Sequence, residues 1–238
     1  MSGRSLAGMA SRLALSLVLG LTAAGCNGNK SGDRADLATA PPEQAPDPFE
    51  VSDDPPLTAN TRFAAGQLAE GQGNMDAAAT QYREALKIDP EHLQSMFRLG
   101  AVLTRSKRFD EATATWQQYV KATKQSPAAY NNLALCYEAA GREADAEKTY
   151  QAGIARDPKD PACRVNYGLM LARVGRLGDA TTQLGTVLAP AEVQYNLGSV
   201  FEQQGRTEQA KAYYRAALEL DPKLTDAKGR LAQLQAKD

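Results

Sequence analysis

Several residues and patterns that usually carry chemistry are scarce in this sequence. There is a single histidine in 238 residues, His92, so a metal site built from several imidazoles of one chain is excluded. The three cysteines, Cys26, Cys136 and Cys163, have no CxxC or zinc-type spacing. Lysine and arginine total 27 against 28 acidic residues, and no basic block stands out. This balance argues against a nucleic-acid-binding protein.

Catalytic motifs are also lacking. The sequence has neither a phosphate-binding loop nor a nucleophile elbow. His92 follows Pro90 and Glu91 without the spacing of a zinc-protease motif, and we expect it to be a solvated turn residue. We expect Cys136 and Cys163 to be two buried thiols, because their places in the repeat described below are about two helical turns apart. The sequence therefore predicts no enzyme, no cofactor and no small-molecule substrate.

The hydrophobic run near the N-terminus is too short to cross a bilayer. Residues 13–25 carry no charge, but as a helix they rise only about 20 Å, against a hydrocarbon core of ~30 Å. Two positive charges, Arg4 and Arg12, precede the run, and small residues end it. This is the pattern of a secretory signal peptide, which we expect to occupy residues 1–25.

The end of this run, Leu21-Thr22-Ala23-Ala24-Gly25-Cys26, resembles a bacterial lipobox. The resemblance implies that Cys26 receives a diacylglycerol and becomes the first residue of the mature chain, although the family most often has leucine where Ala23 stands. The alternative is an ordinary cleaved signal followed by a coincidental cysteine. Asn27 stands where an inner-membrane retention signal would be aspartate, so the resemblance implies a lipid anchor in the outer membrane, facing the periplasm.

The next segment, residues 26–58, is rich in proline and acidic residues. It contains seven acidic residues and two basic ones, and Phe49 is its only aromatic residue. Such a composition buries too little apolar surface to offset the entropy of ordering. Half of the chain's twelve prolines lie here: Pro41, Pro42, Pro46, Pro48, Pro55 and Pro56. We predict a disordered acidic linker that separates the remainder of the chain from the membrane.

From residue 59 the sequence repeats with a period of 34 residues. The units are 59–92, 93–126, 127–160, 161–190 and 191–224, and the fourth is four residues short. The eighth residue of each unit is small: Gly66, Gly100, Ala134, Gly168 and Gly198. The twentieth is Ala78, Ala112, Ala146, Ala180 or Ala210, and the twenty-fourth is Tyr82, Trp116, Tyr150, Leu184 or Tyr214. Proline ends three units, at Pro90, Pro158 and Pro222.

These columns resemble the tetratricopeptide repeat family over residues 59–224. The resemblance implies an all-α, right-handed superhelical solenoid of five helix-turn-helix repeats. The fourth repeat departs from the pattern, and we expect its second helix to be shortened and to end at Ala189-Pro190. Residues 225–238, with Leu231 and Leu234 on one face, fit a C-terminal capping helix that covers the last repeat.

In this family the first helices of the repeats line a concave groove that binds partners. The resemblance places an apolar floor at Phe63, Phe97, Leu135, Val165, Leu169 and Tyr195, with charged edges at Glu70, Arg105, Glu138, Arg173 and Glu202. Asn132, Asn166 and Asn196 share one column and could pair with a peptide backbone through their amides. The alternative is that asparagine is simply common at this column of the family.

The resulting hypothesis is a membrane-anchored scaffold that binds protein or peptide partners in the bacterial cell envelope. Repeat lipoproteins of this build resemble assembly factors of pilus and secretion complexes, which is the first expectation. The alternative is a regulatory or accessory subunit of a cell-wall enzyme. An extended peptide or a partner helix suits a groove with an apolar floor and mixed charge at its edge.

Overall fold

The computed structural model describes residues 57–236, which form α-helices and short turns with no strand. The signal peptide, Cys26 and the linker up to Pro56 lie outside the described residues. The helices are α1 (Ala59–Gly71), α2 (Met75–Ile88), α3 (Leu93–Arg105), α4 (Phe109–Ala122), α5 (Pro127–Ala139), α6 (Glu143–Arg156), α7 (Pro161–Arg173), α8 (Leu177–Gly185), α9 (Pro190–Gln203), α10 (Thr207–Leu220) and α11 (Thr225–Gln235). The predicted all-α repeat fold is confirmed.

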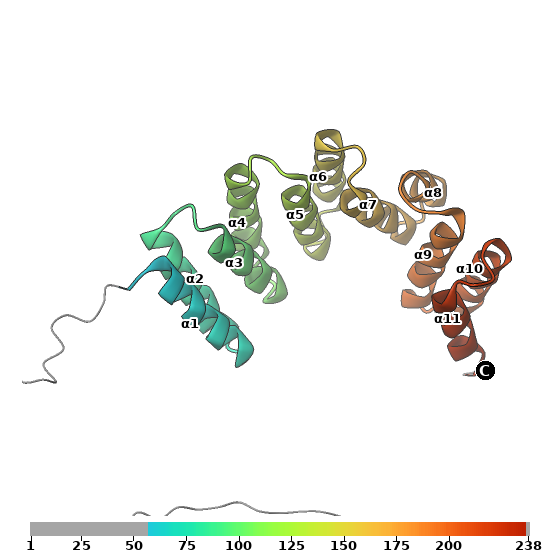
Figure 1. Ribbon diagram of the computed structural model, residues 1–238, viewed down its shortest axis with the longest axis horizontal. Coiled ribbons are helices and arrows are strands. Elements are labelled where there is room, and N and C mark those ends of the chain that lie inside the picture. The colour runs from blue at the N-terminus through green and yellow to red at the C-terminus, as the bar shows by residue number, and fades with distance from the viewer. Residues whose placement is uncertain (1–56, 237–238) are drawn as a thin grey trace, which may run out of the picture. The chain divides into compact units, whose positions relative to one another are not determined.

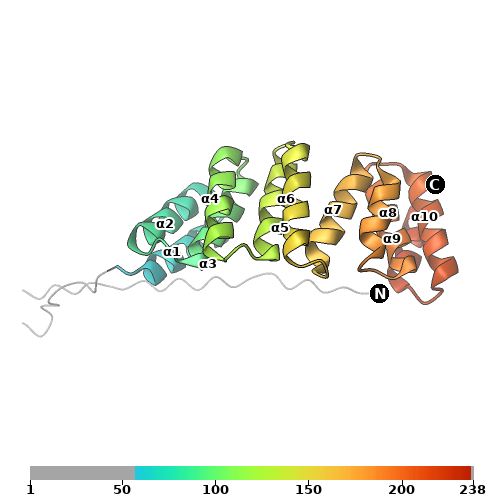
Figure 2. The same ribbon diagram turned by 90° about the horizontal axis from the view of Figure 1, so that it is seen from above.

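The helices are arranged as antiparallel pairs that follow one another in chain order. In Figure 1 the first helices of the pairs, α1, α3, α5, α7 and α9, succeed one another along one side of the row, and the second helices lie along the other. Figure 2 shows the same succession from above. Within residues 57–236, none of the helices has the length and apolar character needed to cross a membrane.

Local sequence determines where most helices begin and end. Thr58, Ser126 and Asp160 cap first helices, their side-chain oxygens accepting from the backbone N–H three residues on. The turns inside four pairs place a glycine at positive φ, between 71° and 84°: Gly73, Gly141, Gly175 and Gly205. The second pair lacks this glycine, and Lys107 takes the same left-handed conformation at φ 58°.

The two helices of a pair pack through the small residue at the eighth position. A Cβ built on Gly66 would lie 2.4 Å from the Tyr82 ring, and one on Gly100 would lie 2.6 Å from the Trp116 ring. In these two pairs the large ring at the twenty-fourth position therefore occupies space that only glycine leaves open, whereas the third pair has Ala134 at the eighth position. The Tyr150 ring contacts the next repeat as well, since its centroid lies 5.9 Å from that of Tyr167.

This packing gives a direct test of the repeat alignment. Ala146, the twentieth residue of the third pair, is fully buried at the crossing of α5 and α6. We expect Ala146→Leu to overpack the crossing and to lower the free energy of unfolding by about 1–3 kcal/mol, measured by urea denaturation. The same change at exposed Ala139 is the control. An unchanged midpoint for Ala146→Leu would contradict the packing described above.

The fourth pair differs from the expectation in its second helix. The predicted shortening is confirmed, since α8 has 9 residues and α6 has 14, but α8 ends at Gly185 and not at Ala189-Pro190, so the predicted end is wrong. The backbone N–H groups of Val187 and Leu188 donate to the Leu184 carbonyl and close the last turn, 3.0 and 2.9 Å. Glycine is a weak helix former, and Pro190 is the first residue of α9, where its missing N–H costs nothing.

The buried side chains form one cluster that extends from α2 to α9 and a second at the C-terminal end. The second cluster is made by α9, α10 and α11 and includes Phe201, Tyr214 and Leu234. α11 covers the last pair with buried Ala227 and Leu234, while most of its other side chains are exposed and polar or charged. This is the arrangement that a capping helix needs.

A candidate peptide-binding groove

The first helices of the first two repeats form an open cleft. Its volume is ≈ 410 Å³, and its lining comes from α1, α3 and one residue of α4: Phe63, Gln67, Leu93, Gln94, Phe97, Arg98 and Tyr119. Leu93 and Phe97 are 41% and 39% exposed. Together with Phe63 they give the cleft an apolar floor beside polar side chains, so we take this cleft as the candidate binding site.

The cleft walls are held in place by aromatic contacts. The Phe97 ring meets the rings of Trp116 and Tyr119 edge to face, with centroids 5.4 and 5.9 Å apart. The Phe63 ring lies 5.4 Å from the His92 ring. Behind the wall, the Trp116 indole N–H donates to the Thr104 hydroxyl, 3.2 Å. The binding surface is therefore preformed, and a ligand would lose little binding free energy to the ordering of these side chains.

A charged recess continues from the cleft along α1 and α3. It is lined by Gln67, Glu70, Gly71, Arg98 and Arg105, with a volume of ≈ 380 Å³, and shares Gln67 and Arg98 with the cleft. The Glu70 carboxylate pairs with the Arg105 guanidinium at 2.5 Å and with that of Arg98 at 3.7 Å. An apolar anchor in the cleft would thus place neighbouring groups of a peptide beside two arginines.

The arrangement around Glu70 recurs in alternate repeats. The Tyr82 hydroxyl donates to the Glu70 carboxylate at 2.9 Å, and the Tyr150 hydroxyl donates to Glu138 at 2.5 Å. The glutamate then pairs with an arginine of the following repeat, Glu138 with Arg173. The third example is made by Glu202, Tyr214 and Arg230. Each cluster ties three helices together on the groove side.

Two arginines predicted to line the groove are therefore already paired. Arg105 and Arg173 lie at the groove edge, half-exposed, and each contacts a glutamate of the preceding repeat. Exposed ion pairs of this kind are weak, so a carboxylate of a ligand can compete for the guanidinium. The sequence pattern showed which face these arginines occupy, but it could not show the partner that holds them.

The asparagine column is less regular than its sequence suggests. The Asn166 amide donates to Asn131 of the preceding repeat at 2.8 Å, and the Asn196 amide donates to the Glu192 carbonyl on its own helix at 2.8 Å. Asn132 makes no side-chain hydrogen bond within residues 57–236. All three are half-buried on the groove side. In two of the three side chains, an amide N–H is therefore already hydrogen-bonded within the protein.

Toward the C-terminal end the predicted floor residues differ in exposure. Leu135 is exposed, while Val165, Leu169 and Tyr195 are half-buried. A small recess of ≈ 210 Å³ adjoins Tyr195 between α9 and α11. In α11 the residue at the place of Phe97 is Gly229, so no aromatic wall forms there. Among the predicted groove residues, the structure brings Phe63 and Phe97 together in one cleft and pairs Glu70 with Arg105 and Glu138 with Arg173.

His92 is not the solvated turn residue that the sequence suggests. Its Nδ1 accepts from the Ser95 backbone N–H at 3.3 Å and caps α3, and its Nε2 lies 3.0 Å from the Asn60 amide oxygen on α1. The ring therefore links two repeats behind the cleft. Its place directly before Leu93, where helix caps stand, was the signal that could have revealed this role.

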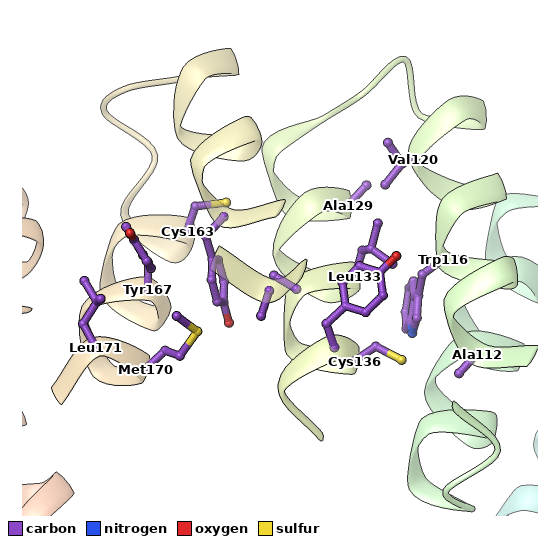
Figure 3. Close-up of a cluster of buried hydrophobic side chains, with 14 of the residues drawn as sticks. Ala112, Trp116, Val120, Ala129, Leu133, Cys136, Cys163, Tyr167, Met170 and Leu171 are labelled. Atoms are coloured by element: carbon purple, nitrogen blue, oxygen red, sulfur yellow. The ribbon is translucent and has the colours of Figure 1, made fainter. Parts of the chain in front are cut away.

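The two described cysteines are free, buried thiols, as expected. Figure 3 shows Cys136 on α5 and Cys163 on α7 among the packed side chains. The Cys163 thiol donates to the Pro127 carbonyl at 3.3 Å, and burial raises its pKa to about 11. A protonated, buried thiol is a poor nucleophile. Nor does any group of histidine, cysteine and acidic residues in the described part of the chain have the arrangement of a metal site.

Comparison with known proteins supports this geometry. Models of the tetratricopeptide repeat match residues 63–127 and 105–161, and a further repeat model matches residues 191–224. Human tetratricopeptide repeat protein 7B is 34% identical over 91 residues, which are 38% of this chain and 11% of that protein. The chain thus spans about a tenth of the length of this relative.

Solved structures share the fold at low sequence identity. A tetratricopeptide repeat protein from Parabacteroides merdae gives a TM-score of 0.56 at 13% identity, covering 74% of this chain and 72% of that one. MamA gives 0.54 at 20% identity, covering 69% and 92%. A thermophilic repeat protein of Thermus thermophilus gives 0.51 at 21% identity, covering 75% and 100%. The chain belongs to the tetratricopeptide repeat family.

Proposed function

We propose that this protein binds an extended segment of a partner protein along the first helices of its repeats and anchors it in the cleft between α1 and α3. The observation that carries the proposal is the open cleft, whose exposed Phe97 ring packs edge to face on the buried Trp116 ring. A cleft of ≈ 410 Å³ has room for an aromatic or branched side chain of the partner and for the peptide groups beside it. The adjoining arginines favour an acidic residue next to that anchor.

We further propose that the scaffold works in the bacterial cell envelope, held by a lipid on Cys26. The support is the lipobox-like sequence from Leu21 to Cys26 and the signal-like run before it. Two or three acyl chains anchor a protein stably, at about 0.8 kcal/mol per buried CH₂. Asn27 favours the outer membrane, with the repeats in the periplasm. Assembly of a pilus or secretion complex is the role we favour within this setting.

The cleft can be tested by photocrosslinking in cells. A photoreactive amino acid in place of Gln94, at the cleft wall, is expected to capture a specific partner, and Phe97→Ser in the same chain should abolish the capture. The substitution removes the aromatic ring and with it the apolar contact, while the serine hydroxyl keeps this part of the helix surface polar. Asn132→Ala, Asn166→Ala and Asn196→Ala together should reduce capture less, since two of these amides are engaged internally.

The control for this experiment is the same photoreactive residue at Lys148, which is exposed on α6, a second helix. It should capture little of the partner found from position 94. Equal capture from both positions, or capture that persists in Phe97→Ser, would place the binding site elsewhere. A partner that is a pilus or secretion component supports the favoured role, whereas a cell-wall enzyme supports an accessory subunit.

The anchor has its own test. Cys26→Ser removes the only thiol that the lipobox could acylate, so the protein is expected to move from the membrane pellet to the soluble fraction. Immunoblotting of fractionated cells measures this directly. Asn27→Asp is the matched variant: it keeps the acylated cysteine and should leave the protein in a membrane. A Cys26→Ser protein that stays in the membrane pellet would rule out lipid anchoring at this residue.

A further inference from the structure

The first helix of the array has an open face that every later first helix buries. The tenth residue of each pair faces the preceding repeat. In the later pairs it is almost inaccessible, at 0–3% exposure: Val102, Cys136, Met170 and Val200. In the first pair it is Leu68, which is 65% exposed. Thr61, at the third position, is likewise exposed, whereas its equivalents are buried.

The sequence before α1 has the pattern of the turns that connect repeats. Two first helices, α3 and α7, and the capping helix α11 are preceded, at the same distance of three residues, by a proline: Pro90, Pro158 and Pro222. Pro56 stands at this distance from Ala59. Thr58 then caps α1 just as Asp160 caps α7. The chain thus enters the first pair as if it were leaving a preceding repeat.

An arginine on α1 lacks a partner that its counterpart in the fourth repeat has. Arg164, the fourth residue of its pair, donates from Nη1 to Gln183 at 2.9 Å and from Nε to the Pro158 carbonyl at 2.7 Å. Arg62, at the same place, donates from Nη1 to Gln81 at 3.1 Å. Its Nε is buried and has no hydrogen-bond partner among the described residues.

A buried N–H without an acceptor is costly, which makes this gap informative. The carbonyl that corresponds to that of Pro158 belongs to Pro56. The residues just before it include two with apolar side chains, Phe49 and Val51. Along a proline-rich extended chain, residues 51 to 58 span about 22 Å. Leu68 lies about 14 Å along α1 from its first residue, which is within that reach.

The charge of the open face is compatible with such a cover. The open side of α1 around Leu68 carries no charge, so it would pack against apolar side chains without burying an unpaired ion.

We propose that residues 49–56 fold back along α1 and cover its open face, in the place of the second helix of a preceding repeat. Phe49 and Val51 pack on Leu68, and the Pro56 carbonyl accepts from Arg62 Nε. The N-terminal end of the array is thereby capped by an extended segment, as its C-terminal end is capped by α11. The spacer between the membrane and the repeats then ends before residue 49. The direction in which the chain enters the repeat array is thereby fixed.

Disulfide trapping tests this arrangement in the full chain carrying Cys26→Ser, whose remaining native thiols are buried. A Val51→Cys, Leu68→Cys pair is expected to form an intramolecular disulfide about tenfold faster than Val51→Cys with Gln67→Cys, which is exposed on the groove side of the same helix at a matched distance along the chain. Equal rates for the two pairs would overturn the proposal. So would a rapid covalent dimer of the Leu68→Cys protein, because a second copy would then cover the face.

Hydrogen exchange provides an independent measurement without new thiols. Phe49→Ser with Val51→Ser should make the amides of α1 exchange about 5- to 30-fold faster, while those of α9 and α10 keep their rates. Leu37→Ser, another apolar residue of the same proline-rich segment, is the matched control and should change nothing. Unchanged exchange in α1 after the double substitution would show that residues 49–56 do not cover it.

Discussion

Replacing Tyr150 with alanine is expected to lower the free energy of unfolding by about 3–5 kcal/mol. The ring is fully buried between α5, α6 and α7, and its hydroxyl donates to Glu138, which also pairs with Arg173 of the next repeat. Removing the ring leaves a cavity at the centre of the array and an acceptor without its donor. Equilibrium denaturation in urea, followed by circular dichroism, measures the loss.

Two conservative substitutions separate the contributions. Tyr150→Phe keeps the ring and removes only the hydrogen bond to Glu138, so it should cost about 1–3 kcal/mol. Tyr130→Phe is the matched control, because the Tyr130 hydroxyl makes no hydrogen bond among the described residues, and it should be close to neutral. A Tyr150→Ala protein as stable as the Tyr130→Phe protein would contradict the packing at the centre of the array.

Stability is also expected to fall steeply in alkali. Burial, together with a hydrogen bond to a glutamate, raises the pKa of Tyr82, Tyr150 and Tyr214 well above the ordinary value near 10. Burial likewise raises the pKa of the Cys163 thiol. In the unfolded chain these groups ionise near about pH 9–10, whereas in the folded protein they stay protonated. The stability they contribute is therefore complete below about pH 9 and is lost as the pH rises.

The size of the effect follows from proton linkage. Above the unfolded pKa, each tyrosine that stays protonated lowers the free energy of unfolding by about 1.4 kcal/mol per pH unit. The three tyrosines together lower it by about 4 kcal/mol at about pH 11. Urea denaturation at about pH 8 and about pH 11 measures the difference. Tyr150→Phe should reduce this difference by about 1.4 kcal/mol, since one tyrosine no longer titrates. A pH-independent free energy of unfolding over this range would contradict the environment described for the three tyrosines.

The sequence by itself determined the repeat fold. Periodicity of 34 residues places a small residue at the helix crossing and a large one against it, and in the structure Gly66 lies on Tyr82 and Gly100 on Trp116. These contacts are made within one pair of helices, so the neighbouring sequence is sufficient to specify them. The same columns identified the face on which Phe63 and Phe97 lie.

Only the tertiary structure decided which groove residues remain available. The cleft requires Tyr119 from a second helix, and Arg105 is held by Glu70 of the preceding repeat. The end of α8 at Gly185 and the roles of His92 and Arg62 were equally hidden from the repeat pattern. The position of a residue in the repeat shows on which face of its helix the side chain lies, because helical periodicity is local. Which residue that side chain contacts depends on the rotation between adjacent repeats. That rotation is set by packing across the whole array.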